Sequence, residues 1–183
     1  WGGLMGFLWR VLRAGLVVGI VGMSTWLKAE AIAFDLSRSS IPTEEILSGG
    51  PPKDGIPALT DPQVVSAEAA TYLRADDRVL GIAMGDRARA YPVRILNWHE
   101  VVNDRLGGTP IVVTYCPLCG TGMVFRAERH GQRVPFGVSG LLYNSDVLLY
   151  DRETESLWSQ LKMEAITGPR LGEKLEWLPA QHT

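Results

Sequence analysis

The sequence predicts a mainly β domain, built from antiparallel strands with short helices, behind one N-terminal transmembrane helix. Short apolar runs alternate with turn residues through the second half of the chain, which is typical of β-rich domains. One long apolar stretch lies near the N-terminus, and the 183 residues leave room for one ordinary domain beyond it. We therefore expect an anchor over 1–28, an extended Pro/Gly-rich linker over 29–60 and a β-rich domain over 61–183.

The N-terminal segment 4–27 is apolar except for two arginines, a serine and a threonine. About 20 helical residues cross a hydrocarbon core, and Arg10 and Arg13 are placed to reach the headgroups. A signal peptide cleaved after a small-residue site at 31–33 is the alternative. Arginines on the N-terminal side predict a cytoplasmic N-terminus and a periplasmic main domain, in a single-pass protein of the bacterial inner membrane.

The same segment carries small residues that indicate a helix partner. Gly15 and Gly19 form a Gly-x-x-x-Gly motif, and Gly22 follows. Small residues let two membrane helices approach closely. We therefore expect the membrane and other membrane-protein subunits as partners.

The region 33–61 is too rich in proline and glycine for a long helix or a central strand. Pro62, which follows Thr60 and Asp61, is typical of a helix start and predicts a helix over 64–73.

The strands follow this predicted helix. Residues 79–84 and 88–93 flank a Gly-Asp turn signal and predict a hairpin, and 95–102 predicts a short helix or turn. A polar turn is expected at 151–154. Further strands are expected at 110–115, 122–125, 134–138, 147–150 and 157–161.

The only two cysteines, Cys116 and Cys119, form a Cys-Pro-Leu-Cys motif directly after a predicted strand. Three interpretations stay open: a disulfide or a pair of free thiols, half of a metal site, or a redox dithiol. A c-type haem is excluded because position 120 is glycine rather than histidine.

A tetrahedral metal site needs more ligands than two cysteines supply. His99 is the best candidate for a third ligand, with His182 or His130 as a fourth. Thiolates and imidazoles suit copper or zinc, and ligand type alone does not choose between these metals. A histidine in such a turn is also typical of a purely structural residue.

Composition narrows the classes of function. The formal net charge is −2 and no long Lys/Arg run occurs, so nucleic acid is not an expected partner. No catalytic triad or cofactor-binding loop is evident, which leaves enzymatic activity undecided and favours a non-catalytic protein.

Four motifs occur in order along the chain: LNWHEVVND at 96–104, TYCPLCG at 114–120, FGVSGLLYNS at 136–145, and LYDR at 149–152 with SLWSQ at 156–160. Together they closely resemble the DUF3179 family, prokaryotic proteins of unknown function, over 34–183. The resemblance implies an exported or membrane-anchored protein and brings no settled reaction. Chains of this family tend to continue past the Leu-Pro-x-x-His-Thr run at 178–183.

Two functions follow from these observations. The first is an accessory subunit of a larger membrane complex, of the photosynthetic or respiratory kind, anchored by a single helix with its β domain on the periplasmic face. The alternative is a periplasmic metal-binding or thiol-redox protein that uses Cys116, Cys119 and His99, with His182.

Overall fold

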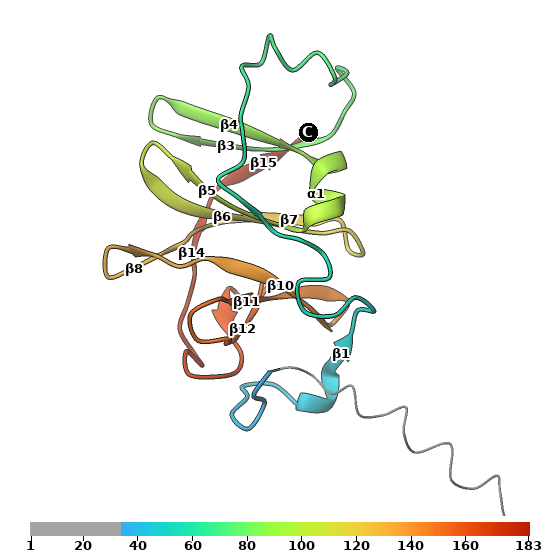
Figure 1. Cartoon of the computed structure of the whole chain (residues 1–183), viewed down its shortest axis with the longest axis vertical. Helices are drawn as coiled ribbons and strands as arrows, with labels where there is room; N and C mark the ends of the chain where they lie inside the picture. The colour runs from blue at the N-terminus through green and yellow to red at the C-terminus, as the bar shows by residue number, and fades with distance from the viewer. Residues whose placement is uncertain (1–33) are drawn as a thin grey trace, which may run out of the picture. The chain divides into compact units, whose positions relative to one another are not determined.

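The computed structural model describes residues 34–183, which form antiparallel sheets and one short α-helix (Figure 1). The predicted mainly β fold class is confirmed for this part of the chain. The predicted anchor over 1–28, with Gly15, Gly19 and Gly22, lies outside the described residues. Among the helices of 34–183, none combines the length and the apolar character that crossing a membrane requires.

A five-stranded sheet occupies the middle of the domain, and its strand β6 (Thr109–Cys116) is buried from Pro110 to Cys116. The continuous apolar run of β6 is the pattern of a strand covered on both faces. The order of the sheet is β14 (Glu176–Leu178), β7 (Thr121–Arg126), β6, β5 (Val101–Leu106) and β2 (Leu59–Thr60). Only the short β2–β5 pair is parallel among the paired strands of 34–183.

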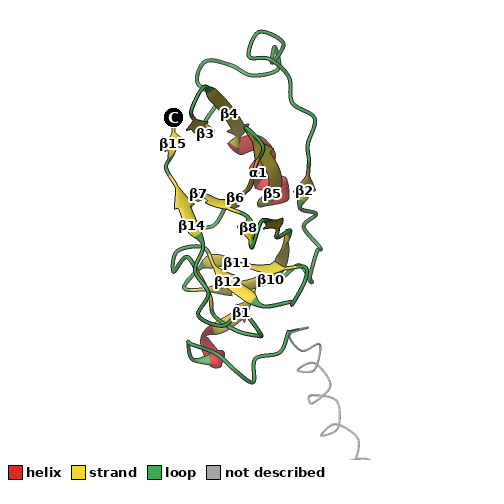
Figure 2. Cartoon of the chain, turned by 90° about the vertical axis from the view of Figure 1, so that its left-hand side faces the viewer, coloured by secondary structure: helices red, strands yellow, loops and turns green. Residues whose placement is uncertain are grey.

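A second five-stranded sheet covers one face of the first (Figure 2). The core between these sheets includes Phe125, Phe136 and Trp158, and the rings of Phe136 and Trp158 meet edge-on with centroids 5.6 Å apart. The order of this sheet is β1 (Ile46–Ser48), β10 (Phe136–Tyr143), β11 (Asp146–Asp151), β12 (Leu157–Ser159) and β13 (Glu164–Ala165).

Asn103 joins the two sheets by hydrogen bonds that imitate a strand ladder. Its Nδ2 donates to the carbonyl of Phe136 at 2.8 Å, and its Oδ1 accepts the amide of Phe136 at 2.7 Å. Asn103 is almost fully buried, so both halves of its side-chain amide are satisfied where water is absent. This pair ties β5 to the start of β10.

A three-stranded sheet and the helix lie over the other face of the middle sheet (Figure 1). The sheet has the order β15 (Ala180–His182), β3 (Val79–Met84) and β4 (Arg87–Pro92), and α1 (Val93–His99) follows β4 directly. The predicted hairpin of β3 and β4 is confirmed. Their buried side chains, with Leu96 of α1, pack on Ile111, Val113 and Tyr115 of β6.

Two short elements complete the described fold. A small hairpin joins β8 (Glu128–Arg129) to β9 (Gln132–Arg133), and a 3₁₀ turn, η1 (Thr43–Glu45), precedes β1. The described part of the expected linker packs into the domain, because Phe34, Ile41 and Ile46 belong to a buried cluster with Tyr150.

The predicted helix over 64–73 is wrong. The structure has isolated turns there, such as the bonds from the Ala69 amide to the Ser66 carbonyl and from the Leu73 amide to the Ala70 carbonyl. A helix of about ten residues is marginal in water without tertiary packing. Most side chains of this segment are exposed, so no core contact stabilises a helix.

Strand β10 carries a bulge between Val138 and Leu142, where the segment 49–54 crosses it. The Gly49 amide donates to the Gly140 carbonyl at 2.7 Å. Gly140 has a φ of +77°, and a Cβ atom added to it would lie 2.2 Å from the carbonyl oxygen of Pro51. The crossing therefore requires glycine at position 140.

We predict that Gly140→Ala destabilises the domain far more than Gly131→Ala. Gly131 has the same φ of +77° but open space around a new Cβ, so its substitution carries only the backbone strain of about 1–2 kcal/mol. Gly140→Ala adds a backbone clash worth roughly 1–3 kcal/mol. Urea unfolding of both variants measures the difference, and equal losses would contradict the crossing described above.

Candidate functional site

The two cysteines lie in the turn that joins β6 to β7. Cys116 ends β6 and is 1% exposed, whereas Cys119 is exposed in the turn itself. The Gly120 amide donates to the Cys116 carbonyl at 2.8 Å, and Gly120 has a φ of +69° that suits glycine at this position. Both cysteines are free thiols in this structure.

Asp146 is the third member of the cluster and comes from the other sheet. It begins β11 directly after Asn144 and Ser145, whose positive φ values of 51° and 61° make the tight turn from β10. The Cys119 Sγ lies 3.3 Å from Asp146 Oδ1, and the Cys116 Sγ lies 3.6 Å from the Ser145 carbonyl oxygen. The candidate ligand atoms of Cys116, Cys119 and Asp146 all lie within 4.8 Å of one another.

Gln160 holds the carboxylate of Asp146 through the same oxygen that Cys119 contacts. Its Nε2 donates to Asp146 Oδ1 at 3.1 Å and to the Thr121 carbonyl at 3.3 Å. Asp146 is 2% exposed and Gln160 is fully buried. Within 34–183, Asp146 Oδ2 and Gln160 Oε1 are buried without a hydrogen-bond partner. Such atoms cost free energy, and an ordered water, a bound ion or a functional role each accounts for them.

Burial sets the protonation of this cluster. It raises the pKa of the Cys116 thiol to about 11 and also raises the pKa of Asp146. The backbone amides of Cys119, Val147 and Leu118 oppose this effect at Cys116, because they favour its thiolate form. The Cys116 thiol therefore keeps a proton that a bound cation would displace.

The three histidines lie elsewhere. His99 Nδ1 is 2.8 Å from the Pro57 carbonyl oxygen, and His182 Nε2 is 3.1 Å from the Gly122 carbonyl oxygen. His130 occupies the β8–β9 turn with a φ of 47°. In the described part of the chain, the cluster of candidate ligands contains the two cysteines and Asp146 and no histidine.

Sequence reasoning missed Asp146 and Gln160 as site residues. Asp146 looks like part of a polar turn, and Gln160 ends a motif without any chemical signature. The available sequence signal was the position of Asp146, which directly precedes an apolar strand. The structure buries this carboxylate, and carboxylates are rarely buried without a partner.

Glu100 directly follows α1 as its C-cap, with a φ of 55°, and carries a half-buried carboxyl group. Burial raises the pKa of Glu100 to about 7. Because this pKa is higher in the folded state, folding is favoured most when the group is protonated. Stability is therefore lost as the pH rises from about 4.5 to about 7 and stays reduced above that range.

We predict that Glu100→Gln stabilises the domain at pH 8 but not at pH 4. The gain should be roughly 1–2 kcal/mol, less than the full pKa shift implies, because solvent still screens part of the carboxylate. Denaturant unfolding at several pH values measures it. Glu44→Gln, at an exposed glutamate, is the matched control, and a Glu100→Gln gain that does not depend on pH would contradict burial as the cause.

Comparison with known families agrees with the motifs that surround this cluster. A family model for DUF3179, described as a protein of unknown function, matches residues 53–183. Comparisons with curated proteins and with solved structures find no match. The matched region covers more than half of the chain and contains Cys116, Cys119, Asp146 and Gln160, so the chain belongs to the DUF3179 family.

Proposed function

We propose that this domain binds one thiophilic transition-metal ion through Cys116, Cys119 and Asp146. The observation that carries the proposal is the convergence of three donor atoms within 4.8 Å, one of them on a buried carboxylate with an unpartnered oxygen. Two sheets supply these donors, so the folded domain presents them together without a histidine.

The donor set favours zinc over copper. Two thiolates suit both zinc and Cu(I), but a carboxylate oxygen is a harder ligand that zinc accepts more readily. Two thiolates and a carboxylate around a divalent ion leave one negative charge in excess. The amides of Leu118, Cys119 and Val147 near the Cys116 sulfur offset part of that charge.

Exposure of Cys119 gives the ion a route in and out. Cys116 and Asp146 are buried, whereas the Cys119 side of the cluster is open to solvent. Gln160 fixes Asp146 through its Nε2 and acts as a positioning residue. Structural zinc sites are usually closed by four protein ligands, so an open side of this kind argues against a metal that only holds the fold.

A catalytic dithiol has weaker support. Reactive cysteines have lowered pKa values, because the thiolate is the nucleophile. Burial instead raises the pKa of Cys116 to about 11. A bound metal removes this obstacle by stabilising the thiolate directly.

We predict that the reduced, metal-free full chain takes up one zinc ion per chain with release of protons. Cys119→Ser and Asp146→Asn should each weaken binding by more than the roughly 10–100-fold that loss of a supporting residue costs. Gln160→Ala should weaken it by roughly 10–100-fold at unchanged stoichiometry. Competition with a chromophoric chelator and elemental analysis measure these effects.

His99→Ala is the matched control, because His99 bonds to the Pro57 carbonyl and is predicted to leave zinc affinity unchanged. Substitution by Co²⁺ adds a spectroscopic check, since sulfur-to-cobalt absorption should fall in Cys119→Ser and persist in Asp146→Asn. If Cu(I) bound more tightly than zinc, the proposed metal would change to copper and the proposed ligands would stay the same. Zinc affinity that depends on His99 or His182, or no binding at all, would overturn the proposal.

The role of an anchored accessory subunit is a second proposal, and exposed apolar side chains favour it. Trp98 on α1 is 75% exposed and Leu118 in the cysteine turn is 68% exposed. Large apolar side chains in solvent often mark interaction surfaces. Native mass spectrometry after extraction in mild detergent should show stoichiometric partner subunits, and a monomer would contradict this role.

A further inference from the structure

A long segment without helix or strand spans 62–78, between β2 and β3, and we call it the arch (Figure 1). Its apolar residues Val64, Val65 and Tyr72 are 53%, 59% and 52% exposed. Segments of this length without secondary structure are uncommon in compact domains and are usually either functional or linkers. The arch therefore presents apolar side chains that the domain itself leaves unpacked.

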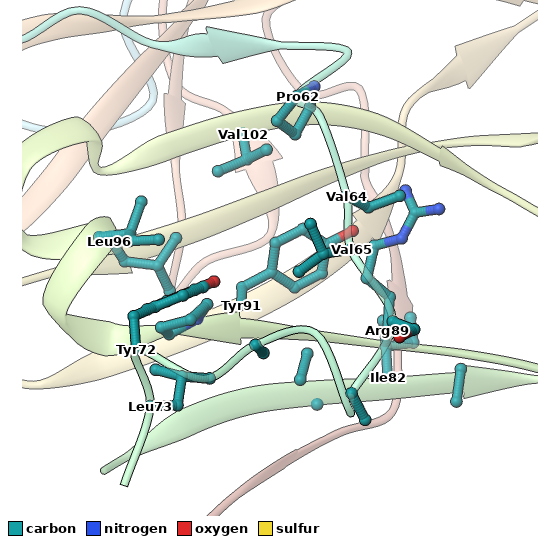
Figure 3. A pocket seen from close by; sticks show the side chains of 18 of the residues that line it. Pro62, Val64, Val65, Tyr72, Leu73, Ile82, Arg89, Tyr91, Leu96 and Val102 are labelled. Carbon is teal, nitrogen blue, oxygen red and sulfur yellow. The ribbon is translucent and has the colours of Figure 1, made fainter.

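A cavity of about 1340 Å³ lies between the arch and the three-stranded sheet, and its lining includes Gly81 of β3 and Gln181 of β15 beside Ala88 and Ala90 of β4 (Figure 3). Figure 3 shows Val64, Val65, Tyr72 and Leu73 of the arch around the ring of Tyr91. The cavity exceeds the range of about 300–1000 Å³ that is typical of small-molecule sites. A cavity of this size that is lined by a β-strand suits an extended peptide better than a small molecule.

The β4 wall of this cavity is a free sheet edge. β4 is the outer strand of the order β15–β3–β4, and Ala88 and Ala90 line the cavity. The Val93 amide donates to the Arg78 carbonyl at 2.9 Å, which fixes the alternation of the antiparallel ladder. The backbone amides and carbonyls of Arg87, Arg89 and Tyr91 thus bond to β3. Those of Ala88 and Ala90 point away from β3.

These backbone groups are available to a partner. Among the turn, loop and side-chain hydrogen bonds of 34–183, none involves the backbone of Ala88 or Ala90. Both side chains are methyl groups, so another backbone can approach closely. Sheet edges are usually blocked by a bulge, a charge or a proline. β4 has no bulge through both alanines, and its charged residues Arg87 and Arg89 and its proline, Pro92, lie at the alternate positions and at its end.

We propose that the free edge of β4 beneath the arch binds an extended peptide segment of a partner protein, which adds to the three-stranded sheet as a fourth strand. Only an extended peptide supplies alternating amide and carbonyl groups at the spacing of Ala88 and Ala90. Its apolar side chains meet Val64, Val65 and Tyr72 of the arch. The inference uses no residue of the metal cluster and is independent of the proposed metal function.

The test selects ligands for the full chain, in detergent, from a displayed library of random heptapeptides. We expect enriched peptides with apolar residues at alternate positions. Ala90→Pro removes the outward amide and places a ring in the path of the added strand, and an edge strand tolerates proline with this orientation. It should weaken peptide binding by about tenfold or more, which is about 1.4 kcal/mol. Ala90→Ser keeps the amide and should bind normally.

A second measurement leaves the protein unchanged. Methylation of the peptide amides that face β4 should abolish binding, and methylation of the alternate amides should not. Hydrogen exchange at the Ala88 and Ala90 amides should slow when the peptide is added. Selected peptides that bind Ala90→Pro or the methylated forms equally well would overturn the proposal. So would a failure to enrich peptides while the cavity binds the small amphiphile 1-anilinonaphthalene-8-sulfonate.

Discussion

The rest of the structure depends on the burial of strand β6 on both faces. Ile111, Val113 and Tyr115 point into the core shared with β3, β4 and α1, whereas Val112 and Cys116 point into the core shared with β10, β11 and β12. Neighbouring residues of one strand therefore supply both cores. Each buried aliphatic side chain contributes roughly 1.5–3 kcal/mol, so β6 joins two otherwise separate layers into one domain.

This constraint also places the cysteine pair. A shift of β6 by one residue would turn Cys116 to the opposite face and send Tyr115 toward β11. The register with β5 and β7 is regular from Ile111 to Thr114, and Asn103 fastens β5 to Phe136 of the second sheet. The position of Cys116 opposite Asp146 is thus fixed by a hydrophobic pattern and by one buried amide, rather than by attraction between the two site residues.

The polar groups around Cys116 differ from the buried side chains of Asp151 and Ser139, whereas Arg133 and Arg170 also keep buried nitrogen atoms without a partner in the described residues. Asp151 accepts hydrogen bonds from the Trp158 indole and from Thr154, and Ser139 bonds to the Leu148 carbonyl. Asp146 and Gln160, in contrast, each keep a buried oxygen without a partner in the described residues. A buried polar atom without a hydrogen bond lowers the stability of the fold. Such atoms are therefore expected at ligand sites more than in parts of the core that serve packing alone. This contrast is the physical basis of the proposed metal site.

The sequence by itself determined the mainly β fold class, the β3–β4 hairpin and the proximity of Cys116 to Cys119, because strand periodicity, turn residues and a two-residue spacer act within a few positions. It did not predict β5, which begins within the segment 95–102 that was expected to be a helix or turn. It did not identify Asp146, which lies 27 residues from Cys119 and reaches it only through the packing of two sheets. His99 stands close to the cysteines in sequence but bonds to Pro57. The helix expected over 64–73 failed for a related reason, since a favourable local signal needs a buried face that the tertiary structure does not supply. Local pattern therefore decided the fold class and the hairpin, and sheet order with its register decided which side chains meet.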